Sequence, residues 1–138
     1  MNQRSIYVTD YDMYRLRRLL DSSTRLEGRD TADLRELKRV LDQADIVSSQ
    51  RIPPDCVTMN ARFRLRDLTT GDESEFILVF PDMANLARGR ISVVSRVGAA
   101  LLGRRELDVV EWEAPAGKKR FLLIEVLYQP EAAEEFHV

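Results

Sequence analysis

The spacing of apolar side chains changes abruptly near Ser48, and this change limits the folds open to the chain. Before Ser48 apolar residues recur at helical spacing, whereas β-branched residues, turns and short alternations dominate after it. A linker over residues 48–55 joins the two parts, and its paired prolines prevent a helix from continuing through it. We therefore predict an α+β protein with a helical part over residues 1–50 and a β-rich part over residues 51–138.

Two helices are predicted in the first part, over about residues 11–21 and 32–46, with Thr9 or Asp10 as the cap of the first. Their apolar stripes are Met13, Leu16 and Leu20 in the first helix and Leu34, Leu37, Leu41 and Ala44 in the second. A short polar turn joins them, so the simplest arrangement is an antiparallel hairpin with arms of ~20 Å. Patterning alone leaves open whether this hairpin packs against the rest of the protein or projects from it.

The second part predicts a five-stranded, mostly antiparallel sheet with one short helix. Ser95 is a candidate cap for that helix, and Gly103 is its stop. A tail over residues 129–138, which contains Pro130, is expected to be loosely held. The predicted strands cover residues 62–66, 75–80, 90–94, 108–113 and 120–128.

Composition excludes several classes of function. The chain has one cysteine, Cys56, and one histidine, His137, which argues against a disulfide framework, a zinc site and a Ser-His-Asp relay. No apolar run approaches the ~20 residues that span a bilayer, and the start has no secretory signal. The net charge of −2 argues against nucleic acid as the main ligand. We expect a cytoplasmic protein that is not an enzyme and needs no cofactor or metal.

Two groups of charged residues are candidate sites. Glu27 and Asp30 lie in the turn between the helices, where two carboxylates can hold Mg²⁺, but exposed acidic residues are usually only solvated. Arg62, Arg64 and Arg66 alternate along one strand, so they share a sheet face. That row is either a binding surface for phosphate or an acidic protein, or an ordinary solvated face.

Several motifs occur in the second part of the chain. They are Val-Thr-Met-Asn at 57–60, Leu-Val-Phe-Pro at 78–81, Ile-Ser-Val-Val-Ser at 91–95, Val-Gly-Ala-Ala-Leu-Leu-Gly at 97–103 and Tyr-Gln-Pro-Glu-Ala-Ala at 128–133. Together, from about residue 55 to 133, they resemble the C-terminal domain of the bacterial Gre transcript-cleavage factors. More closely, the chain resembles the Rnk family, the regulators of nucleoside diphosphate kinase, which are relatives of Gre factors.

The resemblance implies a short antiparallel coiled coil followed by an antiparallel β domain like that of FK506-binding proteins. Family members bind core RNA polymerase near its secondary channel through the globular domain, and the coiled coil points into the channel. We therefore expect a projecting hairpin whose core is separate from that of the globular body. The expected polymerase-binding residues are Ser95, Arg96, Val97, Gly98 and Ala99, and the expected hairpin tip is Thr24, Glu27 and Asp30.

Gre factors use acidic residues at the end of a long hairpin to help hold a catalytic Mg²⁺, whereas Rnk-type proteins have a shorter hairpin. The resemblance thus implies a non-catalytic transcription regulator that competes with Gre factors and contacts nucleic acid only through the polymerase. An effect on nucleoside diphosphate kinase would be indirect. Two alternatives are a peptidyl-prolyl isomerase of the FK506-binding type and a protein that binds the kinase directly through the arginine row.

The chain departs from the family pattern at two positions. The family usually has Gly-Asp before the strand that follows the short helix, but this chain has Leu107-Asp108. Gre proteins often have proline where this chain has Arg96. We expect the turn at Leu107 to be built without the conformational freedom of glycine.

Overall fold

The computed structural model describes residues 5–23 and 31–138. Its mixture of helices and strands confirms the predicted α+β class, and no helix in the described part is long and apolar enough to cross a membrane. The predicted tip residues Thr24, Glu27 and Asp30 lie outside the described residues. The elements are β1 (Tyr7–Thr9), α1 (Asp10–Ser23), α2 (Thr31–Gln43), β2 (Asp45–Val47), β3 (Arg62–Asp67), β4 (Glu73–Val79), η1 (Pro81–Met83), η2 (Leu86–Arg88), β5 (Arg90–Ser92), α3 (Arg96–Leu101), β6 (Val109–Ala114) and β7 (Gly117–Tyr128).

The main sheet has five strands in the order β5-β4-β3-β7-β6, and all pairs except parallel β4–β5 are antiparallel. The alternation in β3 decides which face is buried, since Phe63 and Leu65 are in the core whereas Arg62 and Arg66 are exposed. A second, two-stranded sheet pairs β1 with β2 in parallel. β6 is therefore an edge strand of the main sheet.

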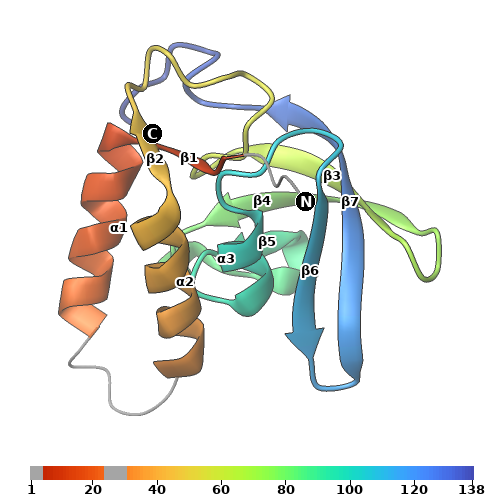
Figure 1. Cartoon of the computed structure of the whole chain (residues 1–138). Helices are drawn as coiled ribbons and strands as arrows, with labels where there is room; N and C mark the ends of the chain where they lie inside the picture. Colours follow the sequence, from red (N-terminus) through yellow and green to blue (C-terminus); the bar gives the residue numbers. More distant parts are fainter. Residues whose placement is uncertain (1–4, 24–30) are drawn as a thin grey trace.

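The helices lie along one flank of this sheet (Figure 1). α1 and α2 run side by side in opposite directions, and α2 contacts α3, which in turn contacts β6. Two predicted caps are present. The Thr9 hydroxyl accepts a hydrogen bond from the Asp12 N–H at 3.0 Å, and the Ser95 hydroxyl accepts one from the Gly98 N–H at 3.1 Å.

The helices share one hydrophobic core with the sheet. A single cluster joins Leu16 of α1 and Leu37 of α2 to Phe63, Leu101 and Leu123 of the body. The expectation of a separate, projecting hairpin core is therefore wrong. The reason is the width of the α2 stripe. Val40 is buried beside Leu37 and Leu41, so α2 presents apolar surface to both α1 and α3.

One predicted helix boundary is wrong, because a backbone partner elsewhere competes with local continuation. The second helix ends at Gln43 rather than near residue 46, and the Asp45 N–H donates to the Ile6 carbonyl at 2.8 Å to begin β2. Cys56, directly after the linker, forms only an isolated bridge with Arg105.

The C-terminal tail is held in place, contrary to prediction. Gln129 is 3% exposed, and its amide Nε2 donates to the carbonyls of Pro53 and Cys56 at 2.8 Å each. The Thr58 hydroxyl donates to the Glu131 carboxylate at 2.7 Å. The Pro53 carbonyl also accepts the Cys56 N–H at 3.2 Å, whereas the Cys56 carbonyl accepts its hydrogen bond from the Gln129 amide of the tail, so the tail satisfies a buried acceptor.

A buried carboxylate ties α1 to the body. The side chain of Asp12 is 1% exposed, accepts the Met59 N–H at 3.0 Å and pairs with Arg15 at 2.6 Å. The Arg15 guanidinium lies 4.1 Å from the centre of the Tyr11 ring and 4.8 Å from that of Phe80. Burial raises the pKa of Asp12 above its ordinary value, and it has the same effect on Glu131.

The turn before β6 has the strain expected from the sequence. Leu107 has a φ of +76°, a left-handed conformation that favours glycine, and its side chain is 68% exposed. Its N–H donates to the Leu123 carbonyl at 2.7 Å, and the Asp108 carboxylate accepts the Arg105 N–H at 2.8 Å. These hydrogen bonds hold the strained turn at the start of β6.

We predict that Leu37→Ala lowers the free energy of unfolding by about 2–5 kcal/mol, because it removes a buried side chain from the shared core. Helix loss followed by circular dichroism should coincide with the fluorescence change of Trp112, which lies in β6. Lys38→Ala, at an exposed position, should cost less than about 0.5 kcal/mol. Melting of the helices while Trp112 keeps its native signal would contradict the shared core.

We predict that Asp12→Asn gains stability relative to the native chain as the pH rises. The native carboxylate binds its proton more tightly when folded, so its contribution is lost as the pH rises from about 4 through the raised pKa. Asn keeps an acceptor for the Met59 N–H and does not titrate. Urea unfolding between about pH 4 and pH 7 measures the difference. Asp10→Asn, at an exposed site on the same helical turn, is the control, and parallel pH curves for all three proteins would contradict the prediction.

We predict that Leu107→Gly raises the free energy of unfolding by about 0.5–1 kcal/mol, because relief of the left-handed strain exceeds the entropic cost of glycine. Leu107→Ala removes the same exposed side chain but keeps the strain, so it should give no gain. Chemical denaturation of the three proteins tests this, and equal effects of glycine and alanine would show that the turn is unstrained.

Candidate functional site

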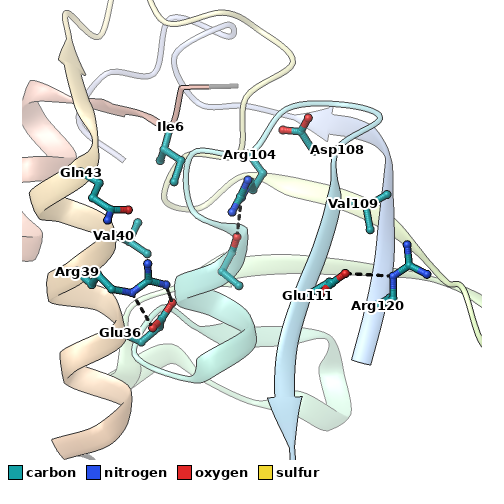
Figure 2. A pocket seen from close by; sticks show the side chains of 11 residues that line it. Ile6, Glu36, Arg39, Val40, Gln43, Arg104, Asp108, Val109, Glu111 and Arg120 are labelled. Carbon is teal, nitrogen blue, oxygen red and sulfur yellow. Dashed lines mark hydrogen bonds and ion pairs between the residues drawn. The ribbon is translucent and has the colours of Figure 1, made fainter. Parts of the chain in front are cut away.

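The groove between α2 and β6 is the best-formed surface feature near the predicted binding segment. A cleft of about 560 Å³ lies there, with α3 at its base (Figure 2). A second hollow of about 340 Å³ adjoins it and shares three lining residues, so the two form one continuous surface. We call this the α2–β6 groove, and the residues used below are Glu36, Arg39, Arg96, Ala100, Arg104, Val109, Glu111, Trp112, Glu113 and Arg120.

Opposite charges neutralise one another along the groove. Arg39 pairs with Glu36 on α2, and this pairing raises the pKa of the Arg39 guanidinium further. Arg120 pairs with Glu111 at 3.3 Å across β7 and β6. The Arg104 Nε donates to the Ala100 carbonyl at 3.2 Å. Such a surface suits contact with a protein, because its polar groups are already fixed in position.

No metal centre is formed by the described residues, in which no three His, Cys, Asp or Glu side chains group as ligands. Cys56 is buried, and burial raises the pKa of its thiol to about 12, so it is not a reactive thiolate. The His137 ring is exposed and meets the Tyr11 ring edge-on, with 6.0 Å between ring centres. The surroundings of Cys56 and His137 therefore indicate a structural role for each of these residues.

The predicted polymerase-binding segment covers the cap and first turn of α3. Arg96 is exposed, and its guanidinium donates to the Glu113 carbonyl at 3.3 Å. Ser95 and Val97 are half-buried, whereas Gly98 and Ala99 are buried. Gly98 and Ala99 therefore shape this surface from beneath, and Arg96 is the exposed member of the segment. Binding of polymerase by this segment stays a prediction.

Gly98 explains why α3 lies so close to β5. A Cβ atom at this position would lie 1.9 Å from the Ser92 carbonyl oxygen, which no side chain can tolerate. The role of this glycine is therefore close packing of the helix against the strand. This close packing of α3 against β5 fixes the position of the helix that forms the base of the groove.

The arginine row is an ion-paired surface. Arg64 pairs with Glu75 at 3.2 Å and with Glu125 at 3.6 Å, and Arg66 pairs with Glu73 at 2.7 Å. These neighbours on β4 and β7 neutralise the two arginines. Of the two interpretations made from sequence, the solvated face is therefore favoured over a phosphate site.

Sequence reasoning missed Asp12 and the pairing of Trp112 with Phe121, whose ring centres are 4.9 Å apart. Asp12 looked like an ordinary acidic residue in a first helical turn. The signal that distinguishes it is its distant partner, the Met59 N–H, and the sequence does not reveal such a contact.

Comparison with known proteins shows the family of the chain. The family model of the GreA/GreB transcription elongation factor C-terminus matches residues 52–128, and that of the Rnk N-terminus matches residues 4–47. The regulator of nucleoside diphosphate kinase of Escherichia coli (strain K12) is 37% identical over 137 residues, which cover 99% of this chain and 98% of that protein.

Two Gre proteins are also similar. The transcription elongation factor GreA of Nitratidesulfovibrio vulgaris (strain DP4) is 31% identical over 108 residues, which cover 78% of this chain and 66% of that protein. The solved structure of the prokaryotic transcription elongation factor GreA/GreB from Nitrosomonas europaea superimposes with a TM-score of 0.72 at 31% identity, covering 91% of this chain and 100% of that one. The chain belongs to the Rnk family of regulators of nucleoside diphosphate kinase, and its C-terminal part is of the GreA/GreB type.

Proposed function

We propose that this protein is a non-catalytic transcription regulator that binds core RNA polymerase at the secondary-channel site and competes there with Gre factors. One observation carries the proposal. The chain matches a regulator of nucleoside diphosphate kinase over 98% of that protein, and its residues 52–128 match the GreA/GreB C-terminal family model. This role would place the protein in the cytoplasm. Any effect on nucleoside diphosphate kinase would follow indirectly from transcription.

The helical pair favours occupancy over catalysis. We treat it as a short coiled coil, with 14 residues in α1 and 13 in α2. Each arm is therefore only about 20 Å long, and both lie alongside the sheet (Figure 1). This geometry supports blocking of a site by the whole molecule, rather than delivery of carboxylates to a distant Mg²⁺.

The two alternatives have less support. An isomerase of the FK506-binding type would need an aromatic-lined pocket. Among the described residues that line the α2–β6 groove, most are charged and Trp112 is the one aromatic. Direct kinase binding through the arginine row would require Arg64 and Arg66 to leave their glutamate partners. We keep the FK506-binding likeness as a description of shape only.

We predict that the purified protein inhibits GreA-stimulated transcript cleavage by core polymerase and does not stimulate cleavage itself. Backtracked elongation complexes are incubated with GreA and increasing amounts of the protein, and the shortened RNA is measured. Inhibition should be relieved by excess GreA, because the two compete for one site. RNA cleavage by the protein alone, or inhibition that excess GreA does not relieve, would contradict the proposal.

A charge reversal locates the contact. Arg96→Glu should weaken inhibition by about tenfold, which corresponds to about 1.4 kcal/mol of binding free energy. Arg88→Glu makes the same change at an exposed position of η2 and should have little effect. Equal inhibition by both variants would show that the first turn of α3 is not the contact.

A further inference from the structure

β6 has backbone groups on one side that the main sheet does not use. The Leu123 N–H donates to the Asp108 carbonyl at 2.9 Å, which sets the alternation of the antiparallel β6–β7 pair. By that alternation the backbone N–H and C=O groups of Val109, Glu111 and Glu113 point away from β7. The hydrogen bond from Arg96 to the Glu113 carbonyl agrees with this direction. Val109 and Glu111 therefore offer an open strand edge.

There is room beside this edge. The α2–β6 groove lies directly against it, and Val109 and Glu111 are among the residues that line the larger hollow (Figure 2). Ala100 of α3 and Val40 of α2 supply small apolar surface on the far side of the groove. A strand edge with a helix across a groove is the geometry in which proteins accept an extended peptide as an added strand.

The charges on the exposed face indicate what that strand would carry. Glu75 on β4 pairs with Arg64 on β3, and Arg64 also pairs with Glu125 on β7. Arg120 on β7 pairs with Glu111 on β6. Each of these cross-strand pairs joins opposite charges, and such pairs stabilise a sheet. The edge strand β6 carries the acidic residues Glu111 and Glu113 on this face. A strand added beside it would therefore form the same kind of cross-strand ion pair if it carried basic residues.

Glu113 strengthens this inference. It stands opposite Lys118 in the β6–β7 register, yet its carboxylate has no ion-pair partner among the residues that the structure describes. A second copy of β6 would be a poor occupant, because antiparallel pairing of two such edges would bring glutamates against glutamates. The complementary occupant is a different chain.

We propose that β6 binds an extended segment of a partner protein as an added strand. The segment has Lys or Arg opposite Glu111 and Glu113, and the side chains between them are small and apolar and face the groove. Arg96, the proposed polymerase contact, lines the same groove and bonds to the Glu113 carbonyl. The inference does not depend on polymerase binding, because it rests on the open edge at Val109 and Glu111 and on the charges of β6.

Labelled peptides test the proposal on the full chain. The probe is a short fluorescein-labelled peptide of alternating lysine and valine, and fluorescence anisotropy measures its binding. A peptide of alternating glutamate and valine should bind about tenfold more weakly, and added salt should weaken binding of the lysine peptide. A lysine peptide N-methylated at every amide has no N–H to donate on either edge, so it cannot pair as a strand and should not bind. Equal binding of all three peptides, or of none, would overturn the proposal.

A matched pair of variants tests the strand edge itself. Val109→Pro removes an outward N–H without removing a bond to β7, and it should weaken peptide binding by about tenfold. Val109→Ala shortens the side chain but keeps the N–H, so the affinity should change less than about twofold. Circular dichroism melting checks that both variants fold. Equal affinities of the two folded variants would exclude strand addition.

Hydrogen exchange on the native chain gives a test that needs no variant. The bound lysine peptide should slow exchange of the Val109 and Glu111 amides but leave those of β4 unchanged. Unchanged exchange at both edge amides would overturn the proposal. Sedimentation of the chain alone distinguishes the other occupant, since a dimer with the same amides protected would assign this edge to a second copy.

Discussion

The burial of α2 between α1 and α3 is the packing constraint on which the rest of the structure depends. Leu37, Val40 and Leu41 form an apolar stripe that is too wide for one neighbouring helix. Burying all of it requires a partner on each side, so the helical pair cannot stand away from the body without exposing Val40 or its neighbours. The position of α2 then fixes one wall of the α2–β6 groove.

Much of the architecture is readable from residue patterns because local and tertiary preferences agree there. The alternation around Phe63 and Leu65 predicts β3 and its buried face, and Ser95 predicts the start of α3. At these positions a few neighbouring residues contain the whole signal. The strain at Leu107 is foreseen by a different route, since the family that the chain resembles usually has glycine at this position.

The rest depends on contacts between segments that are distant in sequence. β2 forms because the Asp45 N–H donates a hydrogen bond to the Ile6 carbonyl. The tail is held because the Gln129 amide donates to a carbonyl of the linker. Asp12 joins α1 to the body only because its carboxylate accepts a hydrogen bond from the Met59 N–H. The α2–β6 groove likewise combines separate elements, so sequence reasoning identified Arg96 on it but not Glu36 or Glu113. No periodicity in the sequence reports such pairings.

The anchored tail has a practical consequence for dissecting this molecule. A fragment that stops after Tyr128 would lack Gln129, and the carbonyls of Pro53 and Cys56 would lose the amide that now satisfies them inside the protein. The last ten residues thus belong to the folding unit, although their composition resembles that of a dispensable appendage. Shortened versions of this chain should therefore keep its carboxyl end. A fusion partner placed there needs a spacer, so that residues 129–135 can still pack against the linker.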